Sequence, residues 1–332
     1  TMGYTGPWYA TALTKELGML LLRNNQMLLR QRLSKTTRTQ RKDALTECSA
    51  PTSLAQMEEN YFRLRLEQRI EIAPDIYVTA YPAGHIYGST AFFLEIDDKT
   101  ILYTGDMNLE DSLTLTRGRF PYEADITIFD GTYWERPPFQ RTKAEEQLLQ
   151  AVIDYKRTII PAFTLGRAQE VLALLEQHSL TKEREVILVG MAANISNMVG
   201  LQATYRGLRH LEPTQFQEET VVIAGGGMLQ GGLARALLDA TRNDPTTSVV
   251  LCGYQAPYTL GWSLLQGWGK SFYHQHLYYA RLSAHTTSTL LKEFVKEITG
   301  QKILVHSPYR EADPLPQLLG IHIPKLGEVL RF

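Results

Sequence analysis

Three segments of this chain each place a metal-competent side chain directly after a run of apolar and small residues: His85, Asp106 and His306. Taken singly, each has a structural explanation, since a histidine beside a strand often only makes hydrogen bonds and Gly-Asp is an ordinary turn. Imidazole nitrogen and carboxylate oxygen are nevertheless ligands that suit zinc, and an aspartate can bridge two ions. Side chains at strand ends are held by a rigid sheet and still reach a cleft, so the three together predict a metal site.

Two further residues are of the acid–base type. His285 lies just before a helix that Thr286 or Thr287 could cap, and Asp130 ends a strand. A carboxylate that accepts a hydrogen bond from an imidazole fixes its tautomer and raises its basicity. The pair would make a general acid or a phosphate clamp, whereas each residue alone would be only a helix cap or a turn residue.

Two glycine-containing turns have backbone N–H groups suited to phosphate. One is the helix start at residues 166–167 and the other is the turn at residues 225–227. Arg167 could add a bidentate contact, although it could equally make a buried ion pair within its own domain. We expect Arg167, Gly227 and Ser283 to contact the substrate, while noting that glycine turns more often serve packing.

The elements that must position these residues follow from the apolar pattern. We expect a helix over residues 13–29, a second over 54–65, and strands over 76–80, 90–96 and 99–103, the last two joined by an Asp97-Asp98 turn. Beyond Asp125, short apolar strands alternate with helices, which is typical of a parallel sheet covered on both faces. These strands are expected at 126–129, 159–163, 186–189, 221–224, 249–252 and 303–305, and the helices at 144–155, 168–178, 233–241 and 288–298. The fold class is α/β.

Bulk composition bounds the class of protein. The chain has 332 residues, 44% hydrophobic and 21% charged, with a formal net charge of −1, so its total charge does not attract nucleic acid. No apolar stretch approaches the roughly 20 residues of a membrane span, and we expect no membrane partner. Cys48 and Cys252 fit no metal-ligand spacing and favour a reducing, cytoplasmic location. A basic run between Arg30 and Lys42 is interpreted as a solvated connector or, alternatively, as a lip that attracts phosphate.

A family resemblance emerges from one long motif. The string Ile-Pro-Ala-Phe-Thr-Leu-Gly-Arg-Ala-Gln-Glu at residues 160–170 is similar to a signature of the β-CASP proteins of the metallo-β-lactamase superfamily. Residues 227–232, 253–255 and 259–261, together with the five site segments in the family's order, extend the resemblance over nearly the whole chain. The chain thus resembles bacterial nucleases of the RNase J type and the endonuclease subunit of the polyadenylation machinery.

The resemblance implies a fold and a division into domains. It implies a metallo-β-lactamase αββα sandwich, incomplete at its N-terminus, with an inserted α/β β-CASP domain. The first lobe would cover residues 1–136, the insertion 137–262, and the return to the first lobe 263–332. Single-stranded RNA would pass between the lobes, where Tyr254, Tyr258 and Trp262 could stack bases, unless they belong to the core.

The resemblance also implies a role for each site residue. His85 would bind the first of two zinc ions, Asp106 would bridge them, and His306 would bind the second. Asp130 would orient His285, which would stabilise the transition state or protonate the leaving oxygen. The histidine at position 306 favours the RNA-cutting branch, because the DNA-repair branch usually has valine there. The expected activity is hydrolysis of RNA phosphodiester bonds by hydroxide held between the two ions; whether the protein forms a homo-oligomer is left open.

Some family features are missing. The chain contains no His-x-His-x-Asp-His run, which should precede the segment at residues 6–11, and we therefore expect an N-terminally truncated fragment that is inactive by itself. Gly226 stands where serine is common, and Thr286-Thr287 where Ala-Asp is common. Two alternatives remain: a non-catalytic scaffold subunit of an RNA-processing complex, and a hydrolase of small thioesters or lactams, which usually lacks the insertion.

Overall fold

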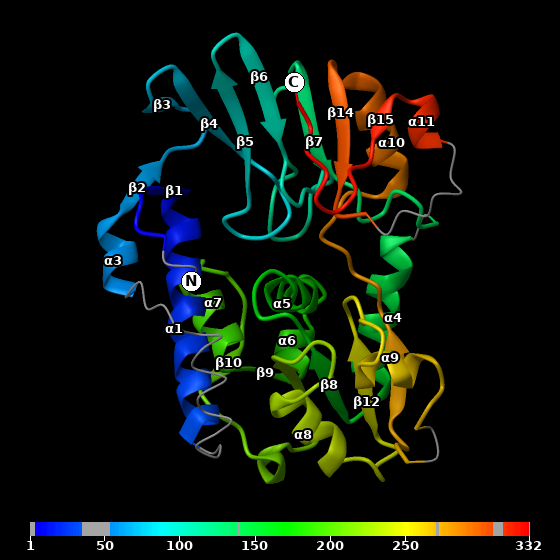
Figure 1. Ribbon diagram of the computed structural model, residues 1–332. Coiled ribbons are helices and arrows are strands. Elements are labelled where there is room, and N and C mark those ends of the chain that lie inside the picture. Colours follow the sequence, from blue (N-terminus) through cyan, green and yellow to red (C-terminus); the bar gives the residue numbers. More distant parts are fainter. Residues whose placement is uncertain (1–3, 35–53, 138–139, 270–271, 308–314, 332) are drawn as a thin grey trace.

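The computed structural model describes residues 4–34, 54–137, 140–269, 272–307 and 315–331. Within these ranges the chain forms two lobes, one above the other in Figure 1, and each lobe is built on one large sheet. The upper sheet is mixed and the lower sheet is entirely parallel. Helices alternate with parallel strands in the lower lobe, and the upper lobe combines a mixed sheet with helices, so the expected α/β class is confirmed.

The upper sheet has seven strands in the order β15-β14-β7-β6-β5-β4-β3. These strands are β3 (Arg69–Ala73), β4 (Ile76–Pro82), β5 (Thr90–Ile96), β6 (Lys99–Tyr103), β7 (Ile126–Asp130), β14 (Gln301–Val305) and β15 (Ile321–His322). Strands β3 to β6 pair antiparallel, and β6, β7, β14 and β15 run parallel to one another. The carboxyl ends of β4, β6, β7 and β14 therefore share one edge, which faces the lower lobe (Figure 1).

The lower sheet has six parallel strands in the order β10-β9-β11-β8-β12-β13. These are β8 (Arg157–Pro161), β9 (Glu185–Val189), β10 (Arg206–Leu208), β11 (Thr220–Ala224), β12 (Thr247–Leu251) and β13 (His276–Tyr279). The helices between them are α4 (Arg141–Asp154), α5 (Arg167–Gln177), α6 (Leu180–Glu183), α7 (Met191–Met198), α8 (Gly232–Ala240) and α9 (Leu260–Leu265), with a 3-10 turn at Pro213–Gln215. The expected strand-and-helix alternation beyond Asp125 is thus present.

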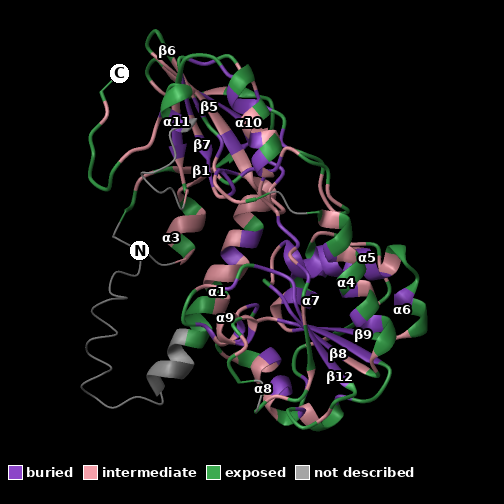
Figure 2. Cartoon of the chain, turned by 90° about the vertical axis from the view of Figure 1, so that its right-hand side faces the viewer, coloured by how far each residue is buried: buried purple, intermediate pink, exposed green. Residues whose placement is uncertain are grey.

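Burial explains why the lower strands read as unbroken apolar runs. Ile160 and Ile223 face a core formed with α4, α5 and α7, whereas their neighbours Ile159 and Val222 face a second core formed with α8 and α9. Both faces of each strand are covered, so no alternation of apolar and polar residues is required. Figure 2 shows the consequence, since β8, β9 and β12 are coloured as buried.

The upper sheet is packed mainly by one helix. Helix α10 (Ser288–Glu297) inserts Leu291 and Phe294 against Phe129 and Leu304 of the sheet. Helix α11 (Leu315–Leu318) lies beside β15. On the other sheet face a smaller cluster joins Val78 to Leu64. The sheet that carries the expected metal ligands therefore rests on a rigid core.

The N-terminal helices and strands differ in part from those expected from the sequence. Strand β1 (Trp8–Thr11) leads into the long helix α1 (Ala12–Ser34), and β1 pairs in parallel with β2 (Tyr61–Leu64). The helix expected over residues 54–65 was therefore too long, because α3 (Leu54–Glu59) ends before β2. Residues 61–64 become a strand because they find a partner some fifty residues earlier in the chain, which no local pattern reveals.

Two connections join the lobes, one following β7 and one following β13 (Figure 1). Strand β13 pairs with β12 in the lower sheet, so the return to the upper lobe lies after Tyr279 and not at the expected boundary of residue 262.

Most of the basic run expected between Arg30 and Lys42, and also Cys48, lies outside the described residues, whereas Cys252 is buried and free. None of the helices in the described ranges combines the length and apolar character needed to cross a membrane.

Candidate metal centre

Four loops bring the site together at the edge of the upper sheet that faces the lower lobe. His85 follows β4, Asp106 follows β6, Asp130 ends β7 and His306 follows β14. The register of β7 and β14 pairs Asp130 with Val305, which sets His306 one residue beyond its neighbour's end. His285 comes from the connection that returns from the lower lobe (Figure 1). Strand order therefore explains why residues distant in the sequence meet here.

Backbone conformations with positive φ set the direction of the candidate metal ligands. Gly84 has φ +76°, and a Cβ there would lie 2.4 Å from the carbonyl oxygen of Asn108, so only glycine fits before His85. Gly105 has φ +55° before Asp106. His306 itself has φ +54°, a left-handed conformation that costs about 1 kcal/mol or more in a residue with a side chain. Such strain persists where surrounding contacts hold it, and here it turns the ring of His306 toward Asp106.

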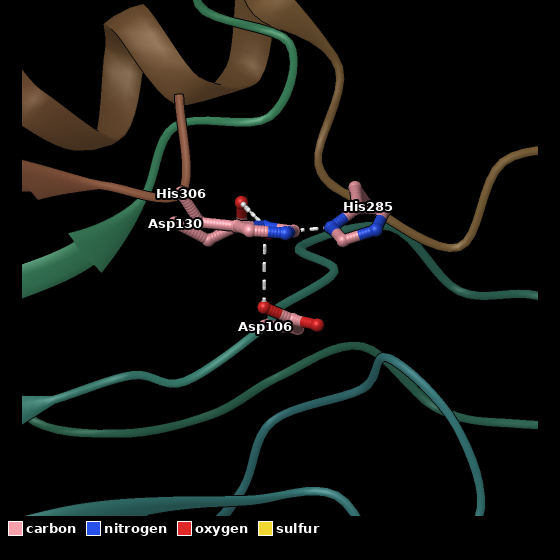
Figure 3. Close-up of side chains that lie close together, drawn as sticks. All are labelled: Asp106, Asp130, His285 and His306. Atoms are coloured by element: carbon pink, nitrogen blue, oxygen red, sulfur yellow. Dashed lines mark hydrogen bonds and ion pairs between the residues drawn. The ribbon is translucent and has the colours of Figure 1, made fainter. Parts of the chain in front are cut away.

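The carboxylate of Asp130 is the buried anchor of the site. Its side chain is 2% exposed; Oδ2 accepts a 2.6 Å hydrogen bond from Nδ1 of His285 (Figure 3). Its Oδ1 accepts from the backbone N–H and the hydroxyl of Thr132, at 2.9 Å and 2.6 Å. Burial alone would raise the pKa of Asp130, but the bond and charge of His285 and the donors of Thr132 hold that pKa at about 2. Asp130 is therefore ionised and fixes the Nδ1–H tautomer of His285.

His85 is held as a neutral imidazole. Its Nδ1 lies 2.8 Å from the carbonyl oxygen of Ala284, and because a carbonyl can only accept, Nδ1 carries the proton. Its Nε2, with a free lone pair, lies 3.8 Å from Oδ2 of Asp106. Burial, followed by the charge of His285, lowers the pKa of His85. A neutral ring with its lone pair directed at a carboxylate is the form that binds a metal.

Asp106 and His306 form the open side of the cluster. Their side chains are 46% and 58% exposed, and Nδ1 of His306 lies 3.4 Å from Oδ1 of Asp106 (Figure 3). The same nitrogen lies 2.8 Å from the hydroxyl of Thr132, so Thr132 contacts both Asp130 and His306. Ligand atoms of Asp106, Asp130, His285 and His306 all lie within 4.8 Å of one another.

These distances fit a metal ion. With bonds of about 2.0 to 2.2 Å, two ligands on one tetrahedral zinc lie about 3.3 Å apart, close to the separations around Asp106. Two carboxylates and three imidazoles supply the nitrogen and oxygen donors that zinc takes. The compact cluster includes Asp130 and His285, which we expected as an acid–base pair, while His85 lies beside it with its ring centroid 4.4 Å from that of His285.

Two of the residues expected to contact the substrate, Arg167 and Gly227, make contacts within the lower lobe. Arg167 is 8% exposed and its guanidinium pairs with Glu170, which also pairs with Arg141. This geometry favours the alternative of an ion pair within the lower lobe. Gly227 packs on the backbone of residues 162–163, and its carbonyl accepts a bond from Gln255.

The hydroxyls near His285 are also turned inward. Ser283 is buried, and its hydroxyl accepts a bond from the backbone N–H of His285, so it positions the histidine. Neither expected side-chain cap of α10 forms: Thr287 occupies the N-cap position without a side-chain bond, and the hydroxyl of Thr286 donates to the carbonyl of Met107. Both contacts fix the loop that carries His285.

Two contacts of the site could not be predicted from the sequence. Thr132 lies within an expected turn, and only the fold brings its hydroxyl to His306. Gly166, in the loop before α5, lies so close to the loop after His85 that a Cβ would stand 2.6 Å from Cγ2 of Ile86. A narrow cavity between the lobes is lined by His85, Gly166 and Glu170. The lower lobe therefore forms part of the wall of the site.

The aromatic residues after β12 are more exposed than a core assignment allows. Tyr254 is 49% exposed and Tyr258 is 90% exposed, and Trp262 contacts Tyr258 at 6.0 Å between ring centroids. The alternative that they belong to the core is therefore wrong for Tyr254 and Tyr258.

Comparison with known proteins identifies one domain and several distant relatives. Residues 168–264 match the model described as the Beta-Casp domain. The chain is 26% identical over 306 residues to cleavage and polyadenylation specificity factor subunit 3 of Dictyostelium discoideum, covering 80% of this chain and 39% of that protein. It is 28% identical over 307 residues to transcription termination factor FttA of Methanothermobacter thermautotrophicus, covering 80% and 46%.

A third relative and one solved structure extend the comparison. The chain is 26% identical over 303 residues to RNase aCSPSF2 of Saccharolobus solfataricus, covering 81% of this chain and 61% of that protein. It thus spans about two fifths to three fifths of the lengths of these relatives. A crystal structure of a protein of unknown function from Enterococcus faecalis V583 superposes with a TM-score of 0.60 at 14% identity, covering 97% of this chain and 75% of that one, which shows a shared fold.

Proposed function

We propose, from the premise that this chain contains a Beta-Casp domain and is distantly homologous to RNA-processing proteins, that it is part of a zinc-dependent ribonuclease. The substrate is single-stranded RNA and the reaction is hydrolysis of its phosphodiester bonds. The observation that carries the proposal is the convergence of His85, Asp106, Asp130, His285 and His306 at the wall shared with the lower lobe.

The proposed ligands are His85, Asp106 and His306. Asp106 would serve both ions, because its two oxygens face different imidazoles: Oδ2 lies near His85 and Oδ1 near His306. Zinc held there would supply Lewis acidity toward the phosphate and a hydroxide at neutral pH. The exposure of Asp106 and His306 leaves this side of the cluster accessible to an RNA strand.

His285 is the proposed general acid. Its Nδ1–H is committed to Asp130, so Nε2 is the atom that can hold a proton for the leaving oxygen. Ionised Asp130 accepts the hydrogen bond from Nδ1 and fixes the ring plane of His285. Ser283 and Thr286 hold the loop on either side of His285, which keeps the proton donor in a fixed position.

The upper lobe is proposed to be part of the metallo-β-lactamase sandwich, with the lower lobe as a lid over the site. A non-catalytic scaffold is less consistent with the cluster, because a scaffold has no need for a strained His306 backbone beside two carboxylates. Since the sequence holds no His-x-His-x-Asp-His run, three proposed ligands serve two ions. We therefore predict that this chain by itself binds zinc weakly and cleaves RNA only at saturating zinc.

The decisive experiment measures zinc affinity and RNA cleavage in parallel. His306→Val should lower zinc affinity by at least about 100-fold and abolish cleavage of a labelled single strand at saturating zinc. His210→Ala is the matched control, because His210 also pairs with a carboxylate, Glu212, but lies exposed outside the site. Equal zinc affinity in His306→Val and the unchanged chain would remove His306 from the site. Tight, stoichiometric zinc retained after dialysis would contradict the predicted weak binding.

A further inference from the structure

Arginine and tyrosine side chains alternate in a line that leads away from the candidate metal centre. The ring of Tyr133 lies 6.1 Å from that of His285. The guanidinium of Arg281 lies 4.9 Å from the centroid of the Tyr133 ring, and that of Arg136 lies 5.2 Å from the same centroid. Arg136 also lies over Tyr254 at 5.6 Å. We call Tyr133, Arg136, Tyr254 and Arg281 the arginine–tyrosine ladder.

The ladder draws its members from both connections between the lobes. Tyr133 and Arg136 belong to the connection that follows β7, and Arg281 belongs to the connection that follows β13 (Figure 1). Tyr254 follows β12 at the carboxyl edge of the lower sheet. The ladder therefore begins against a site residue of the upper lobe and ends on the lower lobe, along the passage proposed for the substrate.

The outer end of the ladder is open to solvent and lies among further aromatic rings. Tyr254 is 49% exposed, and the ring of Phe163, 40% exposed, lies against Gly253, the residue before Tyr254. Tyr279 is also exposed at its surface, and Arg281 and Arg136 both act to lower its pKa against the larger opposing effect of burial. Several π faces and two cations thus share one surface beside the site.

Arg136 differs from the structural arginines of this protein. Arg157 pairs with Asp244 at 2.9 Å, and Arg167 pairs with Glu170, so each has a carboxylate partner. The guanidinium of Arg136 instead lies over the rings of Tyr133 and Tyr254. A guanidinium held between aromatic rings keeps its N–H donors available for an anion.

We propose that the arginine–tyrosine ladder binds the nucleotides that flank the scissile bond of a single-stranded RNA. A base stacks on Tyr254, and the guanidinium groups of Arg136 and Arg281 contact the adjoining phosphates. Aromatic faces accept any base and arginine adds a cation–π contribution, so the ladder recognises a single strand without reading its sequence. This inference rests on the proposed ribonuclease function and identifies the residues that position its substrate.

A duplex should bind poorly to the ladder. Its bases are already stacked on one another and cannot reach the face of Tyr254. The phosphate contacts remain available to a duplex. A duplex should therefore bind more weakly than a single strand because it lacks the stacking on Tyr254, whereas the contacts with the arginines are kept. The ladder thus assigns single-strand preference to one tyrosine.

Binding measured without metal separates this inference from the catalytic proposal. Fluorescence anisotropy of a labelled oligouridylate of about 12 nucleotides, titrated with the full chain in EDTA, gives Kd in the absence of cleavage. Tyr254→Ala should weaken binding about tenfold, and Tyr254→Trp should retain it because indole offers a larger face. Arg136→Gln and Arg281→Gln should each lower the slope of log Kd against log salt concentration by about 0.7, the loss of one phosphate contact to a single strand.

Phe272→Ala is the matched control. Phe272 is 50% exposed and carries Arg242 over its ring at 4.9 Å, but it precedes β13 at the opposite edge of the lower sheet. Its removal should leave Kd unchanged. Unaltered Kd in Tyr254→Ala, an equal loss in Phe272→Ala, or unaltered salt slopes in both arginine variants would overturn the ladder. Zinc-dependent cleavage that persists beside any of these results would leave the ribonuclease proposal intact, whereas loss of cleavage in His306→Val alone bears only on the metal centre.

Discussion

The two sheets meet carboxyl edge to carboxyl edge, and they use the same geometry for different purposes. The edge of the upper sheet presents Asp106 and His306, both exposed and carrying groups that bind metals. The facing edge of the lower sheet presents Gly166 and a buried ion-pair network around Glu170. Parallel strands bring their ends together in both lobes, and the proposed metal ligands lie at the upper edge. At the lower edge the charges around Glu170 are buried in ion pairs, and the edge forms part of the wall of the site.

The difference lies in where each edge places its polar groups: those of the upper edge are exposed, and those around Glu170 at the lower edge are buried. At the upper edge, strain at His306 and polar exposure are tolerated because rigid strands hold the loops. At the lower edge, Glu170 pairs with both Arg141 and Arg167 and fixes the start of α5 against the loop of His85. Mutations of the proposed site residues at the upper edge should therefore affect RNA cleavage with little effect on folding, and mutations in the ion-pair network around Glu170 should do the reverse.

The largest effect is expected at the upper edge. His285→Gln keeps a hydrogen-bonding side chain beside Asp130 but removes the nitrogen proposed to donate the proton. RNA cleavage at saturating zinc should fall by about 10²- to 10⁴-fold, the usual contribution of a general acid, while the melting temperature stays close to that of the unchanged chain. Kinetics of a labelled single strand and a thermal melt measure both quantities. Cleavage within a few-fold of the unchanged chain would mean that His285 donates no proton.

A mutation in the ion-pair network at the lower edge should lower the free energy of unfolding. Glu170→Gln removes the charge that two arginines share, and Glu170 is only 5% exposed. Leaving a buried cation unpaired should cost about 3 kcal/mol in the free energy of unfolding. Glu218→Gln is the control, since Glu218 pairs with Lys156 on the surface and should contribute about 1 kcal/mol or less. Urea unfolding of both variants measures these free energies. Equal losses of stability would show that the buried ion pairs of Glu170 contribute no more than the surface pair of Glu218.

A smaller effect should separate two threonine–aspartate pairs of the same geometry. Thr132 donates its N–H and hydroxyl to Asp130 at 2.9 Å and 2.6 Å, and Thr246 donates the same groups to Asp244 at 2.8 Å and 2.7 Å. Thr132→Val should lower zinc affinity or cleavage about 10- to 100-fold, because Thr132 also contacts His306. Thr246→Val should leave both unchanged. Similar losses from the two variants would point to a general folding effect.

Local sequence was enough to predict the strands that carry the site. The runs before Asp106 and His306 are short, apolar and followed by a ligand, and the structure ends β6 and β14 just before them. The parallel order of the upper sheet then brings these residues together, as expected from the strand ends. Their roles as ligands remain a prediction, because proximity alone does not bind an ion.

Residues whose environment depends on distant partners could not be predicted in the same way. Arg167 has the chemistry of a phosphate ligand, but its burial depends on Glu170 and on Arg141 from another helix. Residues 61–64 read as the end of a helix until β1 pairs with them. Thr132 reaches His306 only because β7 and β14 lie side by side. In each case a contact between distant segments determines the environment or the secondary structure of the residue. The local sequence pattern does not indicate that contact.

The central claim is that the upper edge binds zinc through Asp106 and His306. Crystals of this chain soaked at saturating zinc, measured on both sides of the zinc absorption edge, would locate the ion directly by anomalous scattering. The account predicts a peak about 2.0 to 2.2 Å from an oxygen of Asp106 and a nitrogen of His306. No peak at this edge, with zinc found only at surface pairs such as His210 and Glu212, would contradict it.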